Sequence, residues 1–159
     1  MYEILIVGGG PAGLTAAIYA ARAGKHVAVL ERGSTGGQII SAPLVENYPG
    51  IPSVSGTELA RQMTEQACTF GAEIVYTEAV GLEKTPAGFR VLCTDGVREA
   101  KAVILATGAA HRSLGLAAED ALTGCGVSYC AVCDGTFYEG LDVAVVGGGD
   151  TAVQDALLL

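Results

Sequence analysis

"ILIVGGGPAGLTAA", residues 4–17, decides the fold of this chain of 159 residues. The apolar run over 3–7 ends at glycine, which is typical of a short buried strand. Pro11 stands where the first turn of a helix tolerates proline, so the pattern predicts a helix over 11–24 with a glycine at its end. A second apolar run follows over 26–30. The opening of the chain therefore predicts a strand, a glycine turn, a helix and a second strand.

The glycines of this turn, Gly8, Gly10 and Gly13, have the G-x-G-x-x-G spacing of dinucleotide-binding turns. One glycine permits the tight turn, one lets the backbone approach a pyrophosphate, and one lets the helix pack closely on the strand. The helix N-terminus offers unpaired N–H groups and a partial positive charge to phosphates. Glu31 ends the second strand, where a carboxylate can accept hydrogen bonds from ribose hydroxyls. This context favours dinucleotide binding over a strand-helix-strand unit without a ligand.

A second helix is predicted over 55–70. Ser55 and Glu58 fit a capping box at its start. Apolar residues at spacings of four, four and three predict one face that packs in the core: Leu59, Met63, Ala67 and Phe70.

The remaining apolar runs predict strands. Four short strands with intervening turns suggest a small antiparallel meander inserted into an otherwise parallel sheet. Further buried strands are expected over 102–106 and 142–146, and a helix begins at Asp150. The expected fold class is α/β: a Rossmann-like dinucleotide-binding domain with a β-meander, then the start of a second Rossmann-like domain. The four short strands are expected over 73–76, 79–84, 89–94 and 97–99.

"VAVVGGGDTAVQDA", residues 143–156, repeats the opening pattern. Its turn reads Gly147-x-Gly149-x-x-Ala152, and alanine is an accepted third residue. Two such turns predict two nucleotides, and the usual chemistry is a flavin that exchanges electrons with a nicotinamide. The residue that distinguishes NADH from NADPH is expected about 20 residues past the motif, so the residues leave that choice open.

The composition of the chain limits the classes of partner and the location that can be expected. Half of the residues are hydrophobic and 16% are charged, which is typical of a globular chain. The net charge of −8 argues against binding to nucleic acid. No apolar segment is long enough to span a membrane, and the start lacks the basic region of a signal peptide. We therefore expect a cytoplasmic location.

"GVSYCAVCDG", residues 126–135, places Cys130 and Cys133 two residues apart. A structural zinc needs four ligands, and the other three cysteines form no second close pair, so no metal site is expected. A reducing compartment disfavours a purely structural bridge. Cysteines at i and i+3 meet across one helical turn, which suits a reversible disulfide, and two nucleotide motifs imply an electron source. Asp134 could exchange a proton during that reaction. The pattern favours a redox pair.

Taken together, these motifs resemble the low-molecular-weight, bacterial-type thioredoxin reductases over essentially the whole chain. Single motifs occur in many flavoproteins, but the order and spacing of all of them are specific. The matching stretches are "GGGPAGLTAA", "GGQI" at 36–39, "VENYPG" at 45–50, "ATGA" at 106–109, "GVSYCAVCDG" and "VAVVGGGDTA" at 143–152.

The resemblance implies roles for individual residues. FAD would be held by the first turn, with Glu31 on the adenosine ribose, and NADPH by the second turn. Cys133 would face the flavin, Cys130 would attack the disulfide of thioredoxin, and Asp134 would be the acid. The family is homodimeric. The implied FAD residues are Gly8, Gly10, Pro11, Ala12, Gly13, Glu31, Gly37, Gln38, Asn47, Ala106, Thr107 and Gly108, and the implied NADPH residues are Gly147, Gly149, Asp150, Thr151 and Ala152.

The family chain is about twice as long, so we expect an amino-terminal portion of a reductase. Residues 1–115 would be the first part of the FAD-binding domain, and 116–159 the start of the NAD(P)H-binding domain. We expect this portion alone to bind FAD weakly and not to turn over NADPH. Two alternatives stay open: a related flavoprotein disulfide reductase or dithiol oxidase with another partner, and a non-catalytic nucleotide-binding fragment.

Overall fold

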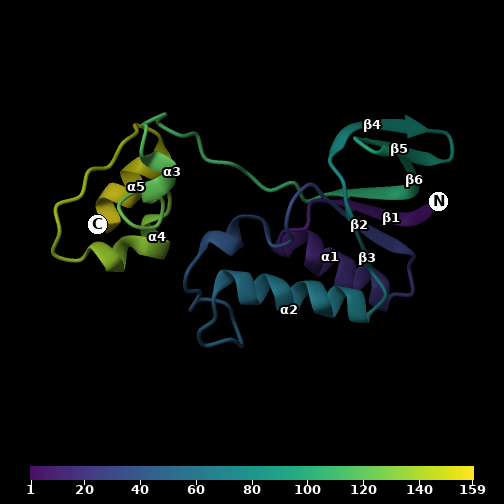
Figure 1. Ribbon diagram of the computed structural model, residues 1–159, viewed down its shortest axis with the longest axis horizontal. Helices are drawn as coiled ribbons and strands as arrows, with labels where there is room; N and C mark the ends of the chain where they lie inside the picture. The colour runs from purple at the N-terminus through teal and green to yellow at the C-terminus, as the bar shows by residue number, and fades with distance from the viewer. The chain divides into compact units, whose positions relative to one another are not determined.

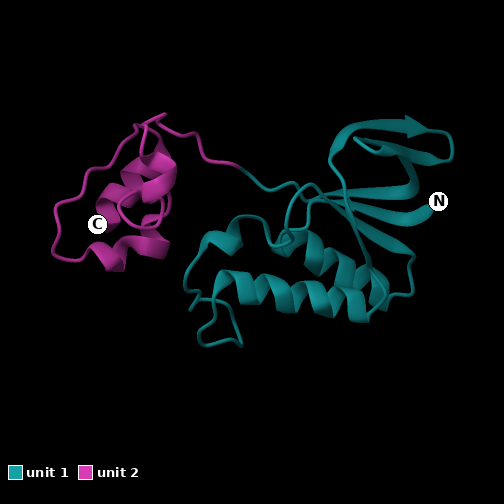
Figure 2. Ribbon diagram, in the orientation of Figure 1, with its two compact units in different colours: residues 1–109 teal, residues 110–159 magenta.

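The computed structural model describes residues 1–159, which divide into two compact units, 1–109 and 110–159 (Figure 2). Residues 1–109 hold one six-stranded sheet in the order β3-β2-β1-β6-β5-β4. The first four strands in this order are parallel, whereas β5 is antiparallel to both β6 and β4. The expected α/β class, with a meander on a parallel sheet, is confirmed. The strands are β1 (Tyr2–Val7), β2 (Val27–Glu31), β3 (Glu73–Tyr76), β4 (Ala79–Thr85), β5 (Gly88–Cys93) and β6 (Gly96–Leu105).

Helices α1 (Pro11–Arg22) and α2 (Gly56–Thr69) lie together on one side of this sheet (Figure 1). Successive residues of a strand point to opposite faces of the sheet, so β1 contributes side chains to two hydrophobic clusters. Ile6 packs with residues of α1 and α2, while Leu5 packs in a second cluster with Val91 and Ala100. The helices thus cover one face and the meander strands the other.

The alanines of α1 let it pack closely. Ala17, Ala20 and Ala21 are all buried. Closer contact comes at the first turn of the helix, where a Cβ added to Gly13 would lie 1.9 Å from the backbone oxygen of Gly8. Only a residue without a side chain fits there, so α1 can begin directly against the end of β1.

The predicted cap of α2 is half formed. Ser55 is the N-cap, and its Oγ accepts the N–H of Glu58 at 3.2 Å. The Glu58 carboxylate does not return to the backbone of Ser55 and instead accepts hydrogen bonds from Arg61 and Gln62. These bonds, the one from Arg61 first, lower the pKa of Glu58 to about 2.

The apolar face of α2 is shorter than its spacing predicts. Leu59, Met63 and Ala67 are buried, but Phe70 is 41% exposed, so its interpretation as a core residue is wrong. The ring follows the last helical residue and lies under the Arg22 guanidinium, whose carbon is 5.4 Å from the ring centroid. A cation above a surface aromatic ring replaces the expected core contact.

Two strand predictions in residues 1–109 need correction. Residues 73–76 form a strand as predicted, but β3 pairs in parallel with β2 at the edge of the sheet, because α2 forms the crossover between them. Residues 97–99 and 102–106 are not separate strands but parts of the continuous β6. Ala100 pairs with Phe89 of the antiparallel part and with Tyr2 of the parallel part, so the strand changes neighbours without a break.

Residues 110–159 form the second unit, which is made of short helices. The predicted strand over 142–146 is wrong, because these residues have no regular structure. A strand needs a partner, and the one β-bridge in this unit joins Thr123 and Val127. The helices are α3 (Glu119–Leu122), α4 (Ala131–Asp134), the 3-10 turn η2 (Gly135–Tyr138) and α5 (Asp150–Leu158). None of the helices in the chain has the length and apolar character needed to cross a bilayer.

The contact between Gly13 and Gly8 predicts a sharp difference between two glycines. Gly13→Ala should lower the free energy of unfolding by about 3 kcal/mol, because its Cβ overlaps a backbone oxygen that cannot turn away. Gly33→Ala is the matched control, since its Cβ would meet nothing closer than 3.9 Å. Urea denaturation followed by circular dichroism measures both, and equal midpoints would contradict the packing argument.

Candidate functional site

The first glycine turn joins the carboxyl ends of three strands. Gly8 has a φ of +106°, and its N–H donates to the Leu30 oxygen at 2.9 Å. A Cβ on Gly8 would lie 2.2 Å from the oxygen of Ala106, directly after β6. The turn therefore needs glycine both for its left-handed backbone and for the closeness of the next strand.

Gly10 has the opposite environment. It is the N-cap of α1, and no side chain caps the helix. A Cβ on Gly10 would meet nothing closer than 3.9 Å, where the Cα of Gly37 lies. The first N–H groups of a helix lack partners inside it, so those after Pro11 face an open space. A helix start with free N–H groups and no side chain over it is a cradle that can accept the oxygens of a phosphate group.

Glu31 ends β2 beside this cradle. Its Oε2 accepts the N–H of Gly9 at 2.7 Å, and its Oε1 accepts the N–H of Gly33 at 2.9 Å. Each carboxylate oxygen keeps a second lone pair, so both remain able to accept from a hydroxyl. The spacing of the motif predicted a ribose ligand and missed that Glu31 also fastens the turn.

Most of the other predicted residues of this site lie near the first glycine turn or in the connection after β6, whereas Asn47 lies in a separate loop. Ala106 bonds its N–H to the Val7 oxygen at 2.8 Å, and Thr107 and Gly108 follow it in the exposed connection. The Gln38 side chain donates to the oxygen of Ala109. Asn47 is exposed in the loop between the paired residues Val45 and Val54, and no hydrogen bond joins it to the turn.

The second glycine turn repeats the backbone of the first. Gly147 has a φ of +140°, and Gly149 is an extended N-cap with no side-chain cap, like Gly10. The Val153 N–H donates to the Gly149 oxygen at 3.2 Å, as Leu14 does to Gly10 at 2.9 Å. Gly149, Asp150, Thr151 and Ala152 line a cavity of about 730 Å³ within residues 110–159.

Cys130 and Cys133 are joined in a disulfide, with their Cα atoms 5.3 Å apart. Cys130 is the N-cap of α4, and its Sγ accepts the N–H of Cys133 at 3.2 Å. Cys133 is exposed and Cys130 half-buried, so solvent reaches the bridge. The three remaining cysteines are free, and no cluster of three or more metal-binding side chains occurs.

Asp134 is held next to this bridge by a serine that sequence reasoning missed. The Ser128 hydroxyl donates to Asp134 Oδ2 at 2.6 Å and accepts the N–H of Cys130 at 3.1 Å. One hydroxyl therefore links the predicted acid to the backbone of the first cysteine.

A second group missed by sequence reasoning surrounds Glu119, the one charged side chain that is buried, at 3% exposure. Its carboxylate accepts the N–H groups of Leu114, Gly115 and Leu116 at 2.8, 2.7 and 3.1 Å. It also accepts the phenol of Tyr129. The Tyr129 bond first, and then the backbone bonds, lower the pKa of Glu119 to about 2, while the pKa of Tyr129 rises to about 12.

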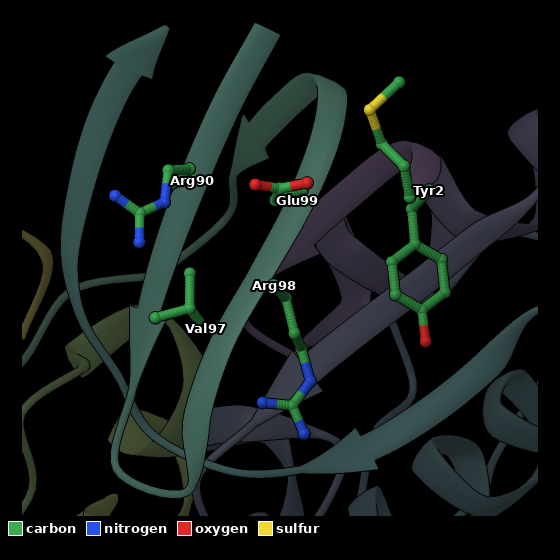
Figure 3. A pocket seen from close by; sticks show the side chains of 6 residues that line it. Tyr2, Arg90, Val97, Arg98 and Glu99 are labelled. Carbon is green, nitrogen blue, oxygen red and sulfur yellow. The ribbon is translucent and has the colours of Figure 1, made fainter. Parts of the chain in front are cut away.

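A pocket of about 370 Å³ at the start of the chain contains none of the predicted site residues (Figure 3). Two of its lining residues are arginines, but Arg90 is paired with Glu83 and Arg98 with Asp95. The Arg98 bond is the main cause that lowers the pKa of Asp95. Since both guanidinium groups are already paired with carboxylates, the pocket offers no free arginine to an anionic ligand.

The fold and these sites define a Rossmann-like α/β protein with a Cys-x-x-Cys disulfide. Residues 2–159 match the family described as pyridine nucleotide-disulphide oxidoreductase, and the chain belongs to this family.

Similar proteins agree with the resemblance that the motifs indicate. The chain is 45% identical to the thioredoxin reductase of Listeria monocytogenes and 44% identical to that of Bacillus subtilis, each over 159 residues. The crystal structure of thioredoxin reductase from Streptococcus pyogenes is 49% identical, with a TM-score of 0.93 over 99% of this chain and 52% of that one. The resemblance is confirmed. The chain spans about half the length of the curated relatives it matches.

The Glu119 cluster predicts acid sensitivity within residues 110–159. Its pKa is depressed from 4.5 to about 2, so the carboxylate stabilises the folded form fully above pH 4.5. That stabilisation is lost as the pH falls from 4.5 toward 2, because protonation removes an acceptor of four donors. The amide resonances of Leu114–Leu116, followed by NMR, should titrate with an apparent pKa near 2. A midpoint at 4.5 would show that the cluster does not form.

Proposed function

We propose that the chain supplies the flavin-binding site and the redox dithiol of an NADPH-dependent thioredoxin-disulfide reductase. One observation carries the proposal: a dinucleotide turn with a fastened carboxylate and a solvent-reachable disulfide next to Asp134 occur in one chain of this family. The thioredoxin reductases that it matches over its whole length support the choice of partner.

The first turn would hold FAD. The open side of Gly10 and the uncapped N-terminus of α1 suit the pyrophosphate, and Glu31 suits the adenosine ribose. When bound, the flavin supplies two-electron transfer between a nicotinamide and the disulfide. The residues proposed for FAD are Gly8, Gly10, Pro11, Ala12, Gly13, Glu31, Gly37, Gln38, Asn47, Ala106, Thr107 and Gly108.

The second turn would hold NADPH. Its uncapped helix start and the adjoining cavity suit a phosphate-bearing ligand. The residues proposed for this site are Gly147, Gly149, Asp150, Thr151 and Ala152. One related structure is named a ferredoxin-flavin thioredoxin reductase, from Clostridium acetobutylicum, at 36% identity and a TM-score of 0.64. The second turn favours a nicotinamide as the electron donor here.

The dithiol form would act by thiol–disulfide exchange. The Cys130 thiolate attacks one sulfur of the thioredoxin disulfide, breaking that bond and forming a mixed disulfide. The N–H of Cys133 aimed at Cys130 Sγ favours this thiolate. The Cys133 thiolate then attacks Cys130 Sγ, which releases reduced thioredoxin and restores the bridge. Asp134, fixed by Ser128, would take the proton from the Cys133 thiol and pass it to the leaving sulfur of thioredoxin.

The wider assignments belong to the same proposal. Residues 1–115 would be the first part of the FAD-binding domain and 116–159 the start of the NAD(P)H-binding domain. A homodimer follows from the family resemblance. Three free cysteines are typical of a reducing compartment, which supports a cytoplasmic location.

FAD binding tests the first turn. Gly10→Ala should lower stability by only about 1 kcal/mol, the usual cost of alanine at an N-cap, because its Cβ meets no protein atom closer than 3.9 Å. The same Cβ enters the phosphate cradle, so FAD affinity should fall by about tenfold or more. Quenching of FAD fluorescence measures this, and Gly148→Ala is the control, because its Cβ would meet no atom within 4 Å and it lies outside the first turn. Equal affinities for Gly10→Ala and the parent chain would place the flavin elsewhere.

Replacement of the sulfurs tests the reaction. In the full polypeptide, Cys130→Ser and Cys133→Ser should each abolish NADPH-dependent reduction of thioredoxin, while Cys125→Ser should retain it. Each redox cysteine supplies one half of the exchange, whereas Cys125 is unpaired. Thioredoxin reduction is followed with NADPH and, separately, with reduced ferredoxin as donor. Activity with ferredoxin alone would replace the proposed donor, and turnover in both redox variants would overturn the function.

A further inference from the structure

Glu119 is a buried charge to which the proposed function gives no role. Burying a carboxylate is unfavourable unless it is hydrogen-bonded, and this one accepts four donors. Three donors are consecutive backbone N–H groups at 114–116, and the fourth is the phenol of Tyr129. The carboxylate therefore fastens two segments to α3.

Tyr129 is fixed from two directions. Its hydroxyl donates to Glu119 Oε1, and its ring stacks on His111 with centroids 3.4 Å apart and planes at 17°. Both contacts come from residues before α4. The aromatic side chain thus anchors the chain at one point, immediately before the first redox cysteine.

This anchor is the start of the disulfide turn. Cys130 follows Tyr129 directly and begins α4, where the Asp134 N–H donates to the Cys130 oxygen at 3.0 Å. The two cysteine Cα atoms are 5.3 Å apart, within the narrow range that a disulfide allows. Holding the first residue of so short a turn restricts how far its sulfur can move from the second.

We propose that Glu119 is a positioning residue for the Cys130–Cys133 pair. It acts through Tyr129 and holds the turn so that the two sulfurs meet, which favours the disulfide over the dithiol. The inference rests on the proposed function only in taking this pair as redox-active.

The equilibrium can be measured with glutathione. Two glutathione thiols give two electrons and two protons to the bridge: the Cys130–Cys133 bond breaks, a glutathione disulfide forms, and both cysteines become thiols. Loosening the turn lowers the effective concentration of one thiol near the other. Less disulfide should then remain at a given ratio of reduced to oxidised glutathione.

Three single variants of the chain test this. Tyr129→Phe keeps the ring on His111 and removes only the hydroxyl, while Glu119→Gln exchanges one acceptor oxygen for a donor. In both Tyr129→Phe and Glu119→Gln, the equilibrium constant for disulfide formation should fall about three- to tenfold. A tenfold fall corresponds to about 30 mV in the reduction potential of the pair. Asp120→Asn, on the exposed neighbour in α3, should leave the constant unchanged. The oxidised fraction is read by alkylation and mass spectrometry.

The double variant Glu119→Gln/Tyr129→Phe separates positioning from general loosening. If Glu119 acts through Tyr129, the double variant should shift the equilibrium no further than the larger single one. Additive shifts, or constants equal to that of the parent in both single variants, would overturn the proposal. Should Glu119→Gln prevent folding of residues 110–159, Tyr129→Phe alone decides.

The assay uses no flavin, nicotinamide or thioredoxin. If the chain shows the shift but the full polypeptide reduces no thioredoxin, the proposed function is disproved and the positioning role stands. If the full polypeptide reduces thioredoxin but neither Glu119→Gln nor Tyr129→Phe changes the dithiol–disulfide equilibrium, the proposed function stands and the positioning role is disproved.

Discussion

Gly13 lies so close to the backbone oxygen of Gly8 that a Cβ on residue 13 would be only 1.9 Å from it. The rest of the first unit depends on this contact. It lets α1 start directly on the end of β1, with its uncapped N-terminus beside the ends of β2 and β6. A bulkier residue would push the helix away and separate the N–H groups from the Glu31 carboxylate. One close approach between two glycines therefore creates both the packing and the anion cradle.

The second glycine turn shows which part of this arrangement is local. Gly147 has a positive φ as Gly8 has, and Gly149 is an extended N-cap as Gly10 is, although no strand precedes them. Glycine φ preferences and a helix start are sufficient for the turn itself. The strand over 142–146 depends on hydrogen bonds from neighbouring strands, and residues 110–159 contain none. Val143 and Val146 consequently remain exposed.

The same division explains what could be predicted from sequence. The glycine spacing, the Ser55 cap and the i, i+3 cysteines are local patterns, and the structure contains each of them. Errors arose where a distant partner decided the outcome. Phe70 continues an apolar face but passes beyond the core, and β6 runs on because two different strands pair with it. No periodicity marks Glu119, since its donors are backbone N–H groups and a phenol ten residues away.

The disulfide turn depends both on a local sequence pattern and on contacts with residues elsewhere in the chain. Its closure is local, since α4 spans four residues and Cys133 donates to the sulfur of Cys130. Its environment is not local, because Ser128 orients Asp134 while Glu119 and His111 fix Tyr129. A dithiol that must open and close needs sulfurs that are free to separate and a backbone that returns them to the same place. Placing the rigid contacts on the residues just before Cys130, and leaving Cys133 exposed, meets both requirements.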